Sequence, residues 1–313
     1  MSKNAVKYSI IVLLDEQHED FARFVQNLYD LFTSRNESFE ILIAANGTGG
    51  FLRNTLGQFN NYNEKVKAFE LNTRVPQAVC LKAALRENNG EIIVVCGPYQ
   101  QLSNSAHARL LDSLDDKIDI ICAWRQKRVD PYFNQIQSRI FNTLVRWITG
   151  SDLHDLNCTI RIIRREVIKE TELYGNMYRF LPILAEKKGF KTKEIKCEHY
   201  QEQGKTGFYS LSSYFTRLID IFTLYFNTRF TKKPLRFFSS IGLGFLLTGL
   251  FITFYIFVQR IFIGQPMGGR SLLLLAIFCM VLGVQAASVG LLGEIIAFTH
   301  GRHRKEYSVE KII

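Results

Sequence analysis

Two long segments without a single charged residue constrain this fold more than any other feature of the sequence. They run from Phe237 to Val258 and from Ser271 to Gly293. A helix rises about 1.5 Å per residue, so each segment is long enough to cross a hydrocarbon layer about 30 Å thick. The preceding chain mixes polar and apolar residues, so the sequence predicts a globular part followed by a hairpin of two transmembrane helices.

Basic residues surround the two apolar segments unevenly. Arg260 and Arg270 stand between the segments, whereas the outer flanks hold Lys232, Lys233, Arg236, Arg302, Arg304 and Lys305. Because Lys and Arg accumulate on the cytoplasmic side, we predict a multi-pass protein of the inner (cytoplasmic) membrane, with its globular domain and both termini cytoplasmic. The net charge of +10 fits contact with anionic membrane lipid. No nucleic-acid module is visible, so no nucleic acid partner is expected.

The globular part alternates short apolar runs with helical patterns. The predicted strands are 8–14, 39–45, 66–71, 92–95, 119–124, 158–163 and 191–195, and the predicted helices are 20–35, 76–88, 106–114, 132–149 and 177–187. The run IIVV at 92–95, bounded by Gly90 and by Gly97-Pro98, predicts a central strand buried on both faces. The alternation predicts an α/β fold, a Rossmann-like layered domain with a mostly parallel sheet.

The same patterns predict four parts of the chain. These are a globular domain at 1–210, an interfacial amphipathic helix with a basic linker at 211–236, two transmembrane helices at 237–298 and a cytoplasmic tail at 299–313. In the second part, apolar and aromatic residues recur at helical spacing between Leu211 and Phe226. A core helix of the globular domain is the alternative interpretation of that segment.

The cysteines and histidines show no pattern of ligands. The six cysteines form no C-x-x-C pair and have no regular spacing, so neither a disulfide framework nor a zinc site is expected. The six histidines likewise have no metal-ligand spacing. We predict no metal among these residues, a reduced cytosolic setting, and no signal peptide at the polar N-terminus.

Several segments, in their order and spacing, resemble one enzyme family. They are EILIAANGTGG at 40–50, NGE at 89–91, SRIFNTLVRWITGSDLHDLNCTIRIIRREV at 138–167, KKPLRFFSSIGL at 232–243 and GLLGE at 290–294. The chain is similar over nearly its whole length to family 2 glycosyltransferases that act on polyprenyl or dolichyl phosphate, a group that includes dolichyl-phosphate mannose synthase. This resemblance implies a GT-A-like fold.

The sequence departs from the family at the positions where the resemblance places the nucleotide-sugar donor. The metal-binding Asp-x-Asp after the central strand is matched by Cys96-Gly97-Pro98, and the Asp pair that receives the nucleoside is matched by Ala45 and Asn46. In the loop after the first strand, the family's Pro-x-Tyr is matched by Leu13-Leu14-Asp15. Gln201 stands where the family usually has an arginine in a late phosphate-binding loop.

These departures lead to a preferred hypothesis and two alternatives. The preferred one is a catalytically degenerate glycosyltransferase, a partner, scaffold or regulator in polyprenyl-linked glycan or cell-envelope assembly, for which no cofactor is expected. The first alternative is an active transferase from a nucleotide sugar to polyprenyl phosphate, which would use Mg²⁺ or Mn²⁺ with ligands such as Asp155 and Glu202. The second is a polyprenyl-lipid binding module. A homo- or hetero-oligomer with membrane partners is expected in each case.

A few residues remain as candidates for function. Asp155 matches an acidic residue that the family places near the acceptor phosphate or the metal, although a turn or helix cap would also explain it. Candidate ligands for a lipid phosphate are Arg125, Arg128, Lys232, Lys233 and Arg236. A solvated surface, or membrane topology alone, is the alternative explanation of these cations. Cys96 is better explained as a small core residue than as a nucleophile, because no neighbouring histidine or other base is identified.

Overall fold

The chain divides into two compact units, with the boundary after Ile221. The computed structural model describes residues 6–52, 57, 65–126, 132–171, 173, 175, 177–200, 219–225, 234–264 and 271–301. Four of the predicted site residues, Arg128, Gln201, Lys232 and Lys233, lie outside these ranges. Of the predicted interfacial helix, the structure describes 219–225, and this part is helical.

The first unit is built on one seven-stranded sheet. Its strands are β1 (Tyr8–Leu14), β2 (Phe39–Asn46), β3 (Val66–Leu71), β4 (Ile92–Cys96), β5 (Ile120–Gln126), β6 (Arg161–Arg164) and β7 (Thr192–Glu198), in the spatial order β3-β2-β1-β4-β6-β5-β7. All neighbouring strands are parallel except β6, which runs antiparallel to β4 and β5. The predicted mostly parallel α/β fold is therefore confirmed.

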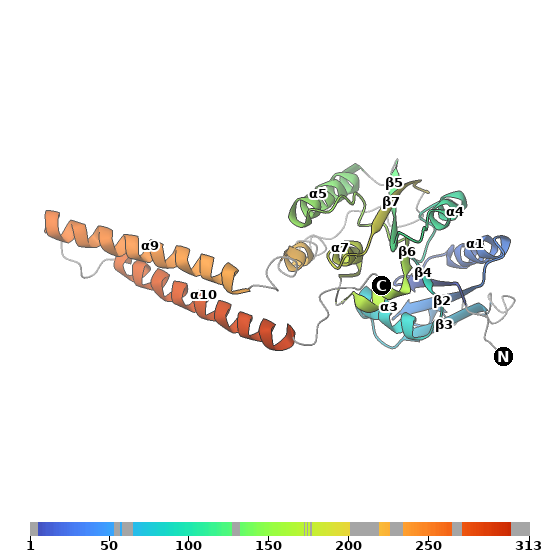
Figure 1. The fold of residues 1–313 in the computed structure, drawn as a ribbon, viewed down its shortest axis with the longest axis horizontal. Coiled ribbons are helices and arrows are strands. Elements are labelled where there is room, and N and C mark those ends of the chain that lie inside the picture. The colour runs from blue at the N-terminus through green and yellow to red at the C-terminus, as the bar shows by residue number, and fades with distance from the viewer. Residues whose placement is uncertain are drawn as a thin grey trace, which may run out of the picture. The chain divides into compact units, whose positions relative to one another are not determined.

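Helices cover both faces of this sheet (Figure 1). They are α1 (Phe21–Ser34), α3 (Gln77–Arg86), α4 (Asn104–Asp112), α5 (Tyr132–Thr149), α6 (Arg165–Glu170), the 3₁₀ turn η2 (Met177–Phe180) and α7 (Leu181–Glu186). Helices α1 and α4 pack in one core cluster, and α3, α6 and α7 pack in the other. Side chains of β1 alternate between the two clusters, which explains its apolar run from Ile10 to Leu14.

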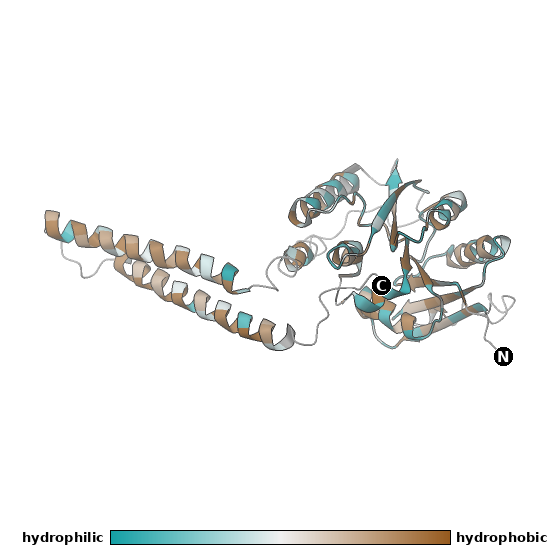
Figure 2. Cartoon of the chain, viewed as in Figure 1, coloured by the Kyte–Doolittle hydropathy of each residue, from teal (hydrophilic) through white to brown (hydrophobic). Residues whose placement is uncertain are grey.

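The second unit is a hairpin of two long helices, α9 (Pro234–Ile263) and α10 (Ser271–Gly301). Figure 2 colours most of both helices as hydrophobic. In each, 17% of the most apolar window is buried, whereas a core helix of a soluble protein would be mostly buried. Both helices are long and apolar enough to cross a membrane, as predicted.

Glycines let the two hairpin helices approach closely. A Cβ atom on Gly242 would lie 2.6 Å from the carbonyl oxygen of Gly283, and one on Gly283 would lie 2.7 Å from the oxygen of Gly242. Larger side chains at these positions would push the backbones apart. At the start of α9, the backbone N of Leu235 donates to Glu294 Oε2 of α10 at 3.2 Å. A side chain of one helix therefore caps the first turn of the other.

Candidate functional site

The carboxyl end of β5 carries a buried ion pair between Arg125 and Asp155, which lies in the loop between α5 and β6. Arg125 Nε donates to Asp155 Oδ2 at 2.8 Å, and Nη2 donates to Oδ1 at 3.1 Å. The backbone N of Arg125 also donates to Oδ2, at 3.3 Å. Both side chains are only 4% exposed. Charges so far from water need such a partner, because desolvating a lone ion costs several kcal/mol.

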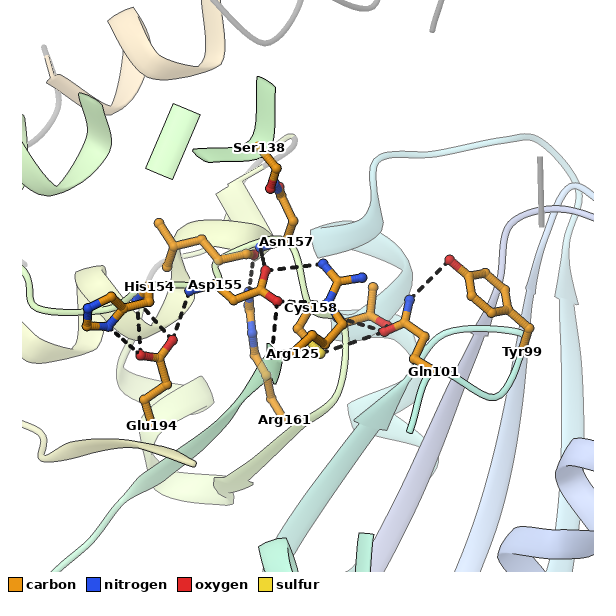
Figure 3. A network of polar contacts seen from close by, with 12 residues as sticks. Tyr99, Gln101, Arg125, Ser138, His154, Asp155, Asn157, Cys158, Arg161 and Glu194 are labelled. Carbon is orange, nitrogen blue, oxygen red and sulfur yellow. Dashed lines mark hydrogen bonds and ion pairs between the residues drawn. The ribbon is translucent and has the colours of Figure 1, made fainter. Parts of the chain in front are cut away.

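Glu194 of β7 holds the loop that carries Asp155. Its carboxylate accepts from the backbone N of His154 at 2.9 Å and of Asp155 at 2.8 Å, and it lies 2.9 Å from His154 Nδ1. The His154 ring stacks on Trp124 of β5, with the ring centroids 4.0 Å apart and the planes 10° from parallel. Figure 3 shows how Glu194, His154, Asp155 and Arg125 form one network. Two strands thus fix the position of Asp155.

A pocket of about 510 Å³, which we call the β5 pocket, lies between the end of β5 and α5. β5 contributes Trp124, Arg125 and Gln126, the loop contributes His154 and Asp155, and α5 contributes Gln135, Ser138, Arg139, Asn142, Thr143 and Arg146. Because Asp155 already pairs with Arg125, the positive charge of the pocket comes from Arg139 and Arg146. Such a pocket suits an anionic group such as a phosphate.

We call the carboxyl ends of β1, β2 and β4 the donor end, after the place that the resemblance gives to the donor. At β4, Cys96 has no exposed surface, and Gly97 and Pro98 follow it. Burial raises the pKa of the Cys96 thiol to about 12. The thiol is therefore protonated at neutral pH and is unsuited to be a nucleophile.

Gln101 organises the segment after β4. Its side chain is buried, and Oε1 accepts from Thr159 Oγ1 at 2.9 Å and from the backbone N of Thr159 at 3.4 Å. Its Nε2 donates to the Tyr99 hydroxyl at 3.1 Å. Neutral hydrogen bonds therefore tie the residues after β4 to those before β6, at the position that the family reserves for metal-binding carboxylates.

Amide groups likewise bind Asp15, the first residue after β1. Asn46 Nδ2 donates to Asp15 Oδ1 at 2.8 Å, and Gln77 Nε2 donates to Asp15 Oδ2 at 2.6 Å. Asn46 also exchanges two hydrogen bonds of 2.8 Å with the backbone of Val75. The polar groups of this part of the donor end therefore bind one another.

The described residues do not fit a divalent metal at either place. Mg²⁺ and Mn²⁺ prefer oxygen ligands from several carboxylates, carbonyls or waters. Cys96, Gly97 and Pro98 offer no carboxylate, and both oxygens of Asp155 accept from Arg125. Within the described ranges, no group of three His, Cys, Asp or Glu side chains is placed to hold a metal ion. Glu202 lies outside those ranges.

The structure brings some of the predicted site residues together and separates others. Arg125 meets Asp155, and Asp15 meets Asn46. The side chains of Leu13, Ala45, Cys96 and Pro98 are buried at the ends of their strands, and Arg236 is exposed near the start of α9.

Three site residues were not foreseen from the sequence. They are His154, Arg161 and Glu194. Arg161 is 2% exposed and donates to the carbonyl oxygens of Tyr178, Leu156 and Arg179. A weak signal existed for Arg161, since a charged residue inside an apolar strand pattern needs buried partners. Two of these partners, Tyr178 and Arg179, are 17 and 18 residues away and left no local pattern.

No family model matches the chain. It is 24% identical over 303 residues to the dodecaprenyl-phosphate galacturonate synthase of Rhizobium johnstonii, which covers 95% of this chain and 90% of that protein. It is also 24% identical over 311 residues to the undecaprenyl-phosphate 4-deoxy-4-formamido-L-arabinose transferase of Yersinia pestis, with 98% of this chain and 94% of that protein covered. The similarity therefore includes the hairpin as well as the globular unit.

Solved structures support the fold of the globular unit. The glucosyl-3-phosphoglycerate synthase of Mycobacterium tuberculosis, solved with Mn²⁺, uridine diphosphate and phosphoglyceric acid, superposes with a TM-score of 0.55 at 8% identity. The superposition covers 72% of this chain and 79% of that one. At this identity it supports the GT-A fold alone. The chain is thus similar from end to end to polyprenyl-phosphate sugar transferases, and its globular unit has the GT-A fold.

Proposed function

We propose that this protein is a membrane-bound transferase that moves a sugar from a nucleotide-activated donor to the phosphate of a polyprenyl phosphate. One observation carries the proposal: two transferases named for polyprenyl-phosphate substrates match this chain over 95% and 98% of its length, globular unit and apolar hairpin together. The basic flanks of the hairpin support an inner-membrane location with the globular unit and both termini in the cytoplasm.

The β5 pocket is the proposed site of the lipid phosphate. Arg139 and Arg146 supply positive charge, and among the described residues neither forms an ion pair with an acid. Ser138 and Asn142 supply polar groups beside them. Arg125 takes part as the partner that keeps Asp155 neutralised, so that the carboxylate does not repel a phosphate. Lys232, Lys233 and Arg236, with Arg128, remain proposed contacts for the lipid headgroup on its way to this pocket.

The reaction is a single displacement at the anomeric carbon. An oxygen of the lipid phosphate attacks this carbon, and the bond to the nucleoside diphosphate breaks, so the leaving group takes the electron pair. The phosphate dianion needs no general base. The described residues do not supply metal ligands for the leaving diphosphate, and no step is assigned to a metal.

A second candidate function is lipid-phosphate binding without transfer, in a partner or scaffold of glycan assembly. The observation that favours it is the donor end, where Cys96-Gly97-Pro98 and Ala45-Asn46 stand at the family's carboxylate positions. There, Asn46 and Gln77 hold Asp15, and Gln101 holds Thr159.

Two measurements on the purified full chain in detergent separate these functions. Calorimetry with farnesyl phosphate, a short polyprenyl phosphate, tests the lipid site, and mass spectrometry after incubation with undecaprenyl phosphate and a panel of UDP- and GDP-sugars tests transfer. Transfer predicts one glycosylated lipid, formed with the wild type and lost in Arg139→Gln with Arg146→Gln. The matched control is Arg86→Gln, an exposed arginine at the carboxyl end of α3.

Each outcome decides between the candidates. The second candidate is supported if farnesyl phosphate binds, no nucleotide gives heat at millimolar concentration, and no glycosylated lipid forms. The first candidate is then wrong. If farnesyl phosphate does not bind and no product forms, both are wrong.

A further inference from the structure

Helix α5 presents a stripe of exposed apolar side chains beside the β5 pocket. Ile136, Ile140 and Trp147 are 37%, 64% and 82% exposed. At 3.6 residues per turn, these three positions fall within about 40° of one another around the helix. Phe141 and Val145, on the opposite side, are buried. The helix therefore has a second apolar face that no described part of the globular unit covers.

The pocket-lining face of α5 lies directly next to this stripe. Arg139 precedes Ile140 in sequence and Arg146 precedes Trp147, so each arginine stands about 100° from its apolar neighbour on the same side of the helix. The 18-residue helix contains no acidic side chain. The arginines that line the β5 pocket therefore lie beside the apolar stripe, whose last residue is Trp147.

We propose that the α5 stripe docks on an anionic lipid bilayer, with Trp147 and Ile140 in the interface and Arg139 and Arg146 at the level of the lipid phosphates. Two observations favour a bilayer over another occupant. The charge of the helix complements anionic headgroups, and tryptophan is characteristic of the boundary between headgroups and acyl chains. Independently, the same chain contains two helices of 29 residues that are apolar enough to cross a membrane.

Docking in this way would place the β5 pocket at the depth where a lipid phosphate lies. A polyprenyl phosphate could then enter sideways from the bilayer without leaving it. This use of the surface rests on the proposed function, whereas the docking itself does not depend on any transfer reaction.

The chain contains two tryptophans, Trp124 and Trp147, which makes the docking directly measurable. The full-length Trp124→Phe variant is reconstituted into vesicles of phosphatidylglycerol and phosphatidylcholine with brominated acyl chains. We expect Trp147 to lose more than about half of its emission relative to unbrominated vesicles, since interfacial side chains reach about 5–10 Å into the headgroup and acyl boundary. In the matched Trp147→Phe variant, Trp124, which stacks on His154, should lose much less.

A second variant keeps the test decisive if Trp124→Phe does not fold. The described cysteines are all buried, so Ile140→Cys introduces a selectively reactive thiol for an environment-sensitive fluorophore. Its emission should shift to the blue in anionic vesicles, whereas the label on Arg23→Cys, an exposed position of α1, should not shift.

The proposal fails if bromolipid leaves Trp147 unquenched. If acrylamide then quenches it, the stripe faces water. If acrylamide does not quench it, protein covers the stripe, either a second copy or another segment of this chain. These results are independent of the farnesyl phosphate and transfer measurements, so the docking and the proposed function can fail separately.

Discussion

At the carboxyl end of β5 the central buried contact is an ion pair, whereas at the donor end amides make the described side-chain hydrogen bonds. The first region contains the buried pair of Arg125 and Asp155, with Glu194 behind it and two arginines lining the pocket. The second contains amides, a protonated thiol and the Asp15 carboxylate, which two amides hold. Both regions lie at one edge of the same sheet.

The difference shows that neighbouring strand ends of one sheet can be stabilised independently, one by an ion pair and the others by hydrogen bonds of amides. A buried ion pair must be complete, because either charge alone is costly in a low-dielectric environment. Hydrogen-bonded amides carry no such constraint and are satisfied by local partners. Anion recognition is therefore expected beside α5, and the donor end is expected to tolerate substitution better.

The largest expected effect is at Asp155. Asp155→Ala leaves the buried Arg125 guanidinium without its partner, which should lower the free energy of unfolding by about 3–5 kcal/mol. For a unit of this size that corresponds to a fall in Tm of roughly 10 °C, measurable by thermal unfolding in detergent. The double variant Arg125→Met with Asp155→Leu should be closer to wild type than the single one. A loss of less than about 1 kcal/mol would remove the contrast between the two regions.

Alkaline pH should affect the two regions alike. Burial raises the pKa of Cys96 at the donor end and of Cys122 in β5 to about 12, from an ordinary value of 9.0. Below pH 9 both states hold the proton and the full stability remains. Between pH 9 and 12 the unfolded thiols ionise while the folded ones do not, so each thiol removes about 1.4 kcal/mol per pH unit. Cys96→Ala and Cys122→Ala should each recover that amount at pH 10, measured by urea unfolding at pH 8 and pH 10. Equal slopes in wild type and variants would show that these thiols are not protected.

The arginines of the β5 pocket should matter for ligand affinity more than for stability. Arg139→Gln and Arg146→Gln should each weaken the binding of farnesyl phosphate about tenfold, which is about 1.4 kcal/mol, because a charge-assisted hydrogen bond is lost. Titration calorimetry measures this. Arg74→Gln, an exposed change in the segment before α3, should leave the affinity unchanged. Equal losses at Arg74 would mean that overall charge, and not the pocket, attracts the phosphate.

The smallest effect is expected at Asp15. Asp15→Asn keeps the shape of the side chain but replaces one of the two acceptor oxygens with an NH₂ group, so one of the hydrogen bonds from Asn46 and Gln77 is lost. This should lower the free energy of unfolding by about 1 kcal/mol. Thermal unfolding of this variant beside Asp155→Ala compares the two regions directly. A cost as large as that of Asp155→Ala would mean that the donor end also depends on a charge.

Local patterns were enough to predict most of the elements. β1 and α5 have the predicted bounds, because an apolar run and an amphipathic period are properties of neighbouring residues. The strand predicted at 158–163 begins at Arg161 instead, and the helix predicted at 177–187 begins as the 3₁₀ turn η2. The antiparallel direction of β6 depends on its partners β4 and β5, which no local pattern reveals.

Some residues of the candidate site were predictable, but their connections were not. Asp155 and Arg125 were both named, yet their pairing spans 30 residues and is decided by the meeting of β5 with the loop before β6. Gln101 and Glu194 act through buried hydrogen bonds whose partners are 58 and 39 residues away. Composition cannot indicate such contacts, because any surface glutamine or glutamate has the same sequence signature.

The cap that Glu294 provides to α9 has a consequence for the order in which the chain is made. Leu235 and Glu294 are 59 residues apart, so the ribosome completes α9 well before it adds the carboxylate that binds the first turn of that helix. Until then, an N–H group at the start of α9 must use water or lipid headgroups as its acceptor. A nascent chain that stops before Glu294 would present most of both apolar helices and still lack this contact, so the hairpin receives this hydrogen bond late in translation.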